Sequence, residues 1–188
     1  MKILLSCENQ VAPLNLLGRF MVWLFLVFYG FNLIFKPMES GMNNLIHFPN
    51  LGFHEAGHLI FSPFGEFVYV IGGSLGQLLM PLVIIIAFLF FKKEAFGSSV
   101  ALWWFGQNML DIAPYINDAR LLELQLLGGG TGKEILGHDW EYLLSKLGWL
   151  RYDYFIANIF YQSGRCIMIL AITWGLAILI RQLNRVNL

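Results

Sequence analysis

The stretch VYVIGGSLGQLLMPLVIIIAFLFF, residues 68–91, decides the fold class of this chain. It holds no charged side chain, and a helix needs about 20 mostly apolar residues to cross a bilayer. Three other long apolar runs lie at residues 16–35, 96–122 and 154–180. We therefore predict an all-α integral membrane protein, a polytopic helical bundle of four to five spans. Gly72 and Gly73 predict either a re-entrant Gly-rich bend or close helix packing through Gly73 and Gly76.

The composition favours a membrane protein over a soluble one. Of 188 residues, 57% are hydrophobic and 13% are charged, against about 25% charged in an average soluble domain. Net charge is zero and no basic patch is present, which argues against nucleic acid as a partner. We expect one membrane-embedded domain over residues 1–188, with a core at about 43–122, a polar loop at 124–153 and a last span at 154–181. We also expect a multi-pass protein of a bacterial inner membrane, with the lipid bilayer as its partner.

The basic residues do not fix the orientation of the spans. If the segment between the first two spans counts as a crossing, one side carries Lys36, Lys92, Lys93, Arg181 and Arg185. The other side carries Lys2, Arg19, Arg120, Lys133, Lys146 and Arg151. The positive-inside rule does not separate two sets of such similar size. Because the Lys92-Lys93 pair and the Arg-rich tail lie closest to span ends, we expect their side to be cytoplasmic.

Between the first two spans, His54-Glu55-Ala56-Gly57-His58 forms an H-E-x-x-H motif. Residues four apart lie on one face of a helix, so both imidazoles can bind one metal ion. Glu55 is placed to take a proton from the attacking water, as in zinc hydrolases. We therefore expect zinc as the cofactor, with His54 and His58 as ligands and Glu55 as the general base. Pro49-Asn50 predicts the start of this short helix, and Pro63 and Gly65 predict its end.

A catalytic zinc usually has three protein ligands, so a third is expected elsewhere. The third span is unusually polar at residues 107–120, and ionisable groups within a membrane normally face the bundle interior. Asp118 is the first candidate, with a salt bridge at the membrane edge as the alternative. Asp111 is the second, as a ligand or as a group that orients a histidine. The two lie about two helical turns apart, with Pro114 between them to kink or unwind the helix.

The H-E-x-x-H stretch and the glycine-containing stretch 73–77 resemble two motifs of the site-2-protease-like intramembrane zinc metalloproteases. His54, Glu55 and His58 match the first motif of that family in full. Gly73-Ser74-Leu75-Gly76-Gln77 stands where the family has Gly-Pro-Leu-Ala-Asn, so Gln77 replaces the asparagine of the family. We expect Gln77, or Asn108 in the third span, to hydrogen-bond the substrate backbone or the oxyanion.

The third span carries the remaining part of the resemblance. Pro114 and Asp118 match the Asn-x-x-Pro and Asp-Gly elements of the family, whereas Asp111 and Ala119 replace its Asn and Gly. The resemblance covers about residues 50–122. It implies a membrane-embedded peptidase fold in which Asp118 is the third zinc ligand.

The polar loop adds His138 to the candidate residues. It could serve as an extra ligand or as a proton carrier. Alternatively, Gly137-His138-Asp139 caps a short amphipathic helix at about 140–147, with Asp139 as the N-cap.

The sequence thus predicts an integral membrane zinc hydrolase, in the first place a peptidase that cleaves in or near the membrane. The degenerate later motifs and His138-Asp139 leave a second reading open, a zinc-dependent hydrolase of lipid amides or esters or another lipid-modifying enzyme. A third reading is a non-catalytic membrane protein with a residual metal site, against which the intact Glu55 argues.

Overall fold

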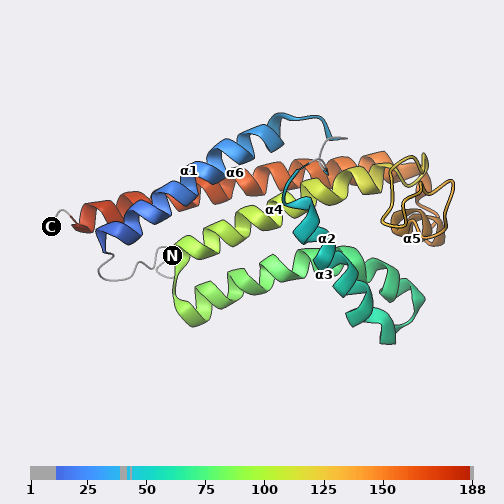
Figure 1. Cartoon of the computed structure of the whole chain (residues 1–188), viewed down its shortest axis with the longest axis horizontal. Coiled ribbons are helices and arrows are strands. Elements are labelled where there is room, and N and C mark those ends of the chain that lie inside the picture. The colour runs from blue at the N-terminus through green and yellow to red at the C-terminus, as the bar shows by residue number, and fades with distance from the viewer. Residues whose placement is uncertain (1–11, 39–41, 43, 187–188) are drawn as a thin grey trace. The chain divides into compact units, whose positions relative to one another are not determined.

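The computed structural model describes residues 12–38, 42 and 44–186, and it is built from helices (Figure 1). The long helices are α1 (Pro13–Phe35), α3 (Glu66–Ile86), α4 (Ala95–Asn117) and α6 (Asp153–Val186). The shorter ones are α2 (His47–Phe61), α5 (Asp139–Lys146), the π-helical η4 (Ala87–Lys92), and the 3-10 turns η3 (Ser62–Phe64) and η5 (Leu150–Tyr152). Within the described residues, β-type pairing is limited to one isolated bridge between Gln125 and Thr131. The prediction of an all-α fold is confirmed.

Three helices of the described chain are long and apolar enough to cross a membrane. They are Pro13–Phe35, Glu66–Lys92 and Leu150–Arg185, and they contain the predicted spans at 16–35, 68–91 and 154–180. The predicted span at 96–122 corresponds to α4, which has 23 residues but is not among the three. The structure is thus consistent with a membrane protein, and the number of four to five spans stays a prediction.

The glycines of the quoted stretch lie inside an unbroken helix. α3 runs from Glu66 to Ile86, so the predicted re-entrant bend is not found in it. Close packing is found instead: a Cβ on Gly57 of α2 would overlap the backbone of Gly72. A Cβ on Gly76 would likewise lie 2.7 Å from Gly57 Cα. α2 and the first half of α3 therefore meet at backbone contact, which glycine alone permits at these positions.

The chain divides into two compact units. Unit 1 comprises the described residues within 1–35, 80–107 and 164–188, and unit 2 those within 36–79 and 108–163. Ala95, Phe96, Ile178 and Leu179 form a buried cluster in unit 1, where α4 begins and α6 ends. Trp23 packs against this cluster and donates its indole N–H to the carbonyl of Ile172 at 2.9 Å, which ties α1 to α6.

Unit 2 contains the H-E-x-x-H motif on α2. This helix begins at His47, slightly before the predicted start, and Pro49 falls in its first turn, where a missing N–H is tolerated. It ends at Phe61, before Pro63 and before Gly65, whose φ is +92°, as the sequence predicts. With 15 residues, α2 is about 22 Å long, shorter than the roughly 30 Å hydrocarbon core of a bilayer.

The polar segment after α4 is fixed to the rest of unit 2 through α5, which lies within one residue of the helix predicted at 140–147. Trp140 is buried, donates its indole N–H to Ser74 Oγ at 3.2 Å, and has its ring 5.9 Å from that of Phe160. At the base of the segment, Arg120 Nε donates to Asp153 Oδ2 at 2.7 Å. These contacts hold the first turn of α5 near α3.

Candidate metal centre

Three side chains of unit 2 direct acceptor atoms at one point. They are His54 and His58 of α2, which are buried, and Asp139 of α5, which is half-buried. Asp139 Oδ2 lies 2.9 Å from His54 Nε2 and 3.3 Å from His58 Nε2. Among the described residues, this is the one group of three or more His, Cys, Asp or Glu whose ligand atoms gather in this way, all within 4.8 Å of one another. The four-residue spacing of the histidines thus leads to one shared site.

The outer nitrogen of each histidine is engaged, which fixes the ring. His58 Nδ1 lies 2.8 Å from the carbonyl oxygen of Tyr69, which only accepts, so Nδ1 carries the proton. His54 Nδ1 lies 3.3 Å from Gln77 Oε1. Gln77 Nε2 donates to Asp111 Oδ2 at 2.9 Å, so the amide oxygen must face the histidine and accept from it. Both rings in their neutral form therefore present a bare Nε2 inward, as metal-binding histidines do.

The three inward atoms fit a divalent metal ion. Two bare imidazole nitrogens and a carboxylate oxygen repel one another unless a proton or a cation lies among them. Ligand atoms about 2.0–2.1 Å from a tetrahedral zinc are about 3.3 Å apart, close to the 2.9 and 3.3 Å found here. Gly73 of α3 keeps the space open, since a Cβ there would lie 2.5 Å from Nε2 of both His54 and His58. Two imidazoles and one carboxylate could hold a metal ion, and this donor set is not specific to zinc.

Asp139 reaches the histidines because the start of α5 is fixed. Its backbone N–H donates to Tyr115 Oη at 2.9 Å. His138, rather than the predicted Asp139, caps the helix, and its Nδ1 accepts the N–H of Glu141 at 3.1 Å. Burial alone would raise the pKa of Asp139, but the two histidine rings, which donate to it when their Nε2 atoms carry a proton, together outweigh burial and hold that pKa below the ordinary value. The carboxylate therefore favours the ionised form that binds metal.

The structure does not bring Asp118, the predicted third ligand, to the two histidines. Asp118 follows the end of α4, and its oxygens accept the backbone N–H groups of Glu123 and Leu124 at 2.9 and 3.0 Å. Its Oδ2 also lies 3.3 Å from Nε2 of His138. Burial lowers the pKa of His138 despite this carboxylate, so the ring is neutral. Asp118 thus shapes the turn after α4 and lies against His138, while Asp139 is the carboxylate that lies next to the two histidines.

Asp111 is the centre of a second buried network. Its carboxylate contacts the side chains of Asn44, His47, Asn50 and Gln77. The closest are Gln77 Nε2 at 2.9 Å and His47 Nδ1 at 3.0 Å, and the hydrogen bond to Asp111 raises the pKa of His47. Because Gln77 also faces His54, Asp111 orients a histidine of the metal group through an amide. Gln77, predicted to contact substrate, is engaged on both sides by protein atoms.

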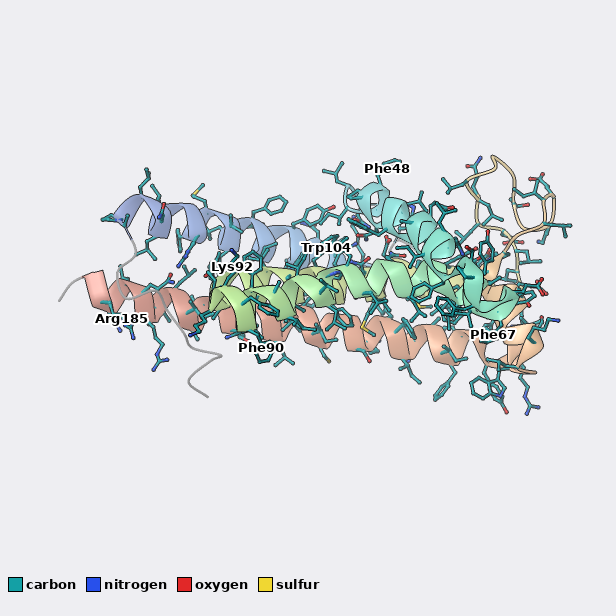
Figure 2. All side chains as sticks on the ribbon, turned by 90° about the horizontal axis from the view of Figure 1, so that it is seen from below. Phe48, Phe67, Phe90, Lys92, Trp104 and Arg185 are labelled. Carbon is teal, nitrogen blue, oxygen red and sulfur yellow. The ribbon has the colours of Figure 1, made fainter. Side chains whose placement is uncertain are left out.

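Glu55 lies on the exposed side of α2. Its charge acts on both His58 and Tyr115, so it borders the group formed by the histidines and Asp139. Helical spacing puts Phe48, labelled in Figure 2, and Leu59 on the same exposed face of α2. The carboxylate of the motif is therefore presented on an otherwise apolar surface.

One face of α4 supplies polar side chains to unit 2. Asn108, Asp111, Tyr115 and Asp118 follow one another at intervals of three and four residues, which places them on one side of a helix. Asn108 is wholly buried, one turn before Asp111. The Tyr115 ring lies 4.4 Å from that of His138 and 6.2 Å from that of the first motif histidine. α4 stays helical through Pro114 to Asn117, so the predicted unwinding is not found.

Sequence reasoning misses two residues of this site. Tyr115 has a detectable signal, because it stands four residues after Asp111 and three before Asp118 on the polar face of α4. Asp139 has a weaker signal in the sequence. A carboxylate in the first turn of an amphipathic helix is common, because it interacts favourably with the positive end of the helix dipole.

No family model matches this chain, and no curated protein or solved structure is significantly similar to it. The resemblance to the site-2-protease-like metalloproteases therefore stays a prediction from the sequence motifs. The function must be inferred from the geometry around His54, His58 and Asp139.

Proposed function

We propose that this chain is an integral membrane metallohydrolase whose metal, zinc in the first instance, is held by His54, His58 and Asp139. The observation that supports this is the convergence of three acceptor atoms beside Gly73, where any side chain would block them. Two histidines with a purely structural role would need neither a carboxylate facing both inward nitrogens nor a space beside them. In this proposal Asp139 replaces Asp118 as the third ligand.

Residues of this chain account for the remaining parts of a hydrolytic reaction. When bound, the ion would polarise a substrate carbonyl and lower the pKa of water. Glu55 takes the proton of the attacking water and returns it to the leaving group. Tyr115 steadies the negative charge on the substrate oxygen: its Oη accepts the Asp139 N–H, and no acceptor among the described residues takes its own hydrogen. Gln77 holds the His54 ring instead of contacting substrate.

The surface around Glu55 supports an apolar substrate. Phe48 and Leu59, which share the exposed face of α2 with Glu55, are each 75% exposed, and Phe64 just beyond α2 is 67% exposed. A substrate that approaches Glu55 across this face meets apolar neighbours, as a segment of a membrane protein would. Cleavage of a peptide bond in or near the membrane is therefore the first candidate reaction.

One feature favours a second candidate, hydrolysis of lipid amides or esters or another modification of lipids. Asp139 belongs to the polar segment between α4 and α6, outside the three helices that are apolar enough to cross a membrane. A ligand from such a segment suits a site at the level of the lipid headgroups. The carbonyl groups of lipids lie in that interfacial region, next to the hydrocarbon core.

Metal content after purification in mild detergent tests the centre. We expect about one zinc per chain, lost in Asp139→Asn and in His54→Ala but retained in Asp118→Asn. Asp118→Asn is a matched control, because the same atom change is made in a carboxylate that contacts a histidine. Loss of metal from Asp118→Asn together with its retention in Asp139→Asn would restore the ligand predicted from sequence. Retention in all three variants would exclude the centre.

The two candidate reactions separate on substrate. A fluorogenic peptide with an apolar sequence and fluorescent lipid amides and esters are offered in the same detergent to zinc-loaded protein. Turnover of one class that disappears in Glu55→Gln, with the metal retained, assigns the reaction to that class. Turnover of neither class by zinc-loaded protein would favour the non-catalytic reading.

A further inference from the structure

The two units carry charge of opposite sign although the whole chain is neutral. Among the described residues of unit 1, six side chains are basic and Glu94 alone is acidic. In unit 2, five described side chains are basic and nine are acidic. The zero net charge of the sequence therefore conceals a strong segregation between the units.

Five of the six basic residues of unit 1 gather at one end of it. Arg19, near the start of α1, lies 3.5 Å from Glu94 in the turn between η4 and α4, and its guanidinium is 5.9 Å from the Phe96 ring. Phe96 packs in turn against Ile178 and Leu179 near the end of α6. These contacts bring together the parts of the chain that carry Arg19, Lys92, Lys93, Arg181 and Arg185, of which Lys92 and Arg185 are labelled in Figure 2.

This arrangement changes how the basic residues are divided between the two ends of the spans. The order of the predicted spans alone places Arg19 at the opposite end from Lys92, Lys93 and the Arg-rich tail. Its ion pair with Glu94 assigns it to their end of unit 1. Lys92, Lys93, Arg181 and Arg185 are exposed. In unit 2, two basic residues are paired with acids, in Arg120–Asp153 and Lys133–Glu123.

We propose that this basic end of unit 1 binds the anionic phospholipid headgroups of the cytoplasmic leaflet and so sets the orientation of the chain. α1, the helix Glu66–Lys92 and α6 are apolar enough to cross the bilayer, and the basic residues lie at their ends. Phe90 and Phe91, 59% and 79% exposed, precede Lys92-Lys93, so exposed apolar surface ends where the basic residues begin. Each basic residue near an anionic surface strengthens binding by about fivefold.

The orientation is tested by cysteine labelling. In a Cys7→Ser/Cys166→Ser background, Asn184→Cys places one thiol between Arg181 and Arg185, and Leu136→Cys places one in the polar segment that precedes α6. We expect a membrane-impermeant maleimide to label Leu136→Cys in intact cells and Asn184→Cys only after permeabilisation. Labelling of Asn184→Cys in intact cells would overturn the orientation, whatever the outcome at Leu136→Cys.

The lipid contact is tested in phosphatidylcholine vesicles with and without about 30% phosphatidylglycerol. The variant Lys92→Gln/Lys93→Gln/Arg181→Gln/Arg185→Gln is compared with the parent and with a control, Lys36→Gln/Lys133→Gln/Lys146→Gln/Arg151→Gln, which removes four basic residues of unit 2. We expect the parent and the control to co-purify severalfold more phosphatidylglycerol than phosphatidylcholine, and the first variant to lose that preference. High salt should abolish the preference in the parent.

Two outcomes would overturn the lipid proposal: equal phosphatidylglycerol retention in the first variant and the parent, or equal loss in both variants. Far-ultraviolet circular dichroism and monodispersity check that both variants are folded. Because neither assay depends on metal or turnover, this proposal stands or falls separately from the proposed hydrolase.

Discussion

Replacing Gly73 by alanine adds one methyl group beside the inward nitrogens of the two motif histidines, where the proposed ion would be bound. The new Cβ would be 2.5 Å from Nε2 of both His54 and His58, whereas atoms in van der Waals contact lie about 3.5–4.0 Å apart. The imidazoles must therefore retreat by about 1 Å, beyond the roughly 0.5 Å within which a site holds its geometry. A structural zinc contributes about 10–16 kcal/mol over four ligands. Loss of one ligand thus costs about 3 kcal/mol, or ~100-fold in affinity.

The assay is competition for zinc with a chelator of known affinity, with melting of the metal-free protein measured in parallel. Alanine is favoured over glycine in a helix interior by about 1 kcal/mol, so Gly73→Ala should fold while it binds zinc at least ~100-fold more weakly. Gly52→Ala is the matched control, because nothing lies within 4 Å of a Cβ at that position of α2. A zinc affinity of Gly73→Ala within about threefold of the parent would refute the placement of the ion.

Three further outcomes are expected. Glu55→Gln should keep its zinc and lose about 10²–10⁴-fold in turnover, because an amide cannot accept the proton of water; full activity would contradict a role as base. Tyr115→Phe should keep zinc and substrate affinity but lower kcat by about 10²–10³-fold, as loss of an oxyanion donor does, and an effect on KM alone would count against this. Asp111 raises the pKa of His47 above 6.5, so their ion pair stabilises the fold below that pH, and the contribution is lost as pH rises through the raised pKa. In excess chelator, the Tm of the parent should fall from pH 6 to 9 relative to that of His47→Gln, and parallel profiles would argue against the pair.

The long apolar helices could be predicted because length and hydropathy are properties of a local stretch. That holds for α1, for α3 continued by η4, and for α6, because the predicted ranges lie within the helices Pro13–Phe35, Glu66–Lys92 and Leu150–Arg185. The re-entrant bend could not be judged in the same way, because the glycine pair at Gly72 and Gly73 suits a bend and a close helix contact equally well. The partner that decides between them is Gly57, on a different helix. Arg19 shows the same limit, since its neighbour Glu94 is distant in sequence.

The two motif histidines could be predicted because their relation is set by the geometry of a single helix turn. The third member of the group could not, because Asp111, Asp118 and Asp139 are all carboxylates near polar residues and only the tertiary path decides which one reaches the histidines. The Asp118 carboxylate instead accepts two backbone N–H groups of the turn that follows it. Asp139 lies next to the two histidines because Trp140 anchors the first turn of α5 to α3.

The position of Asp139 also has a consequence for biosynthesis. Its codon is read after those of α2, α3 and α4, so the ribosome has completed these helices before the third member of the group exists. Until Trp140 has reached Ser74, the nascent chain offers metal only two imidazoles, which bind it weakly. Under the proposed function, acquisition of the ion would then be a late event of synthesis, and a half-made chain would carry neither the complete centre nor its activity.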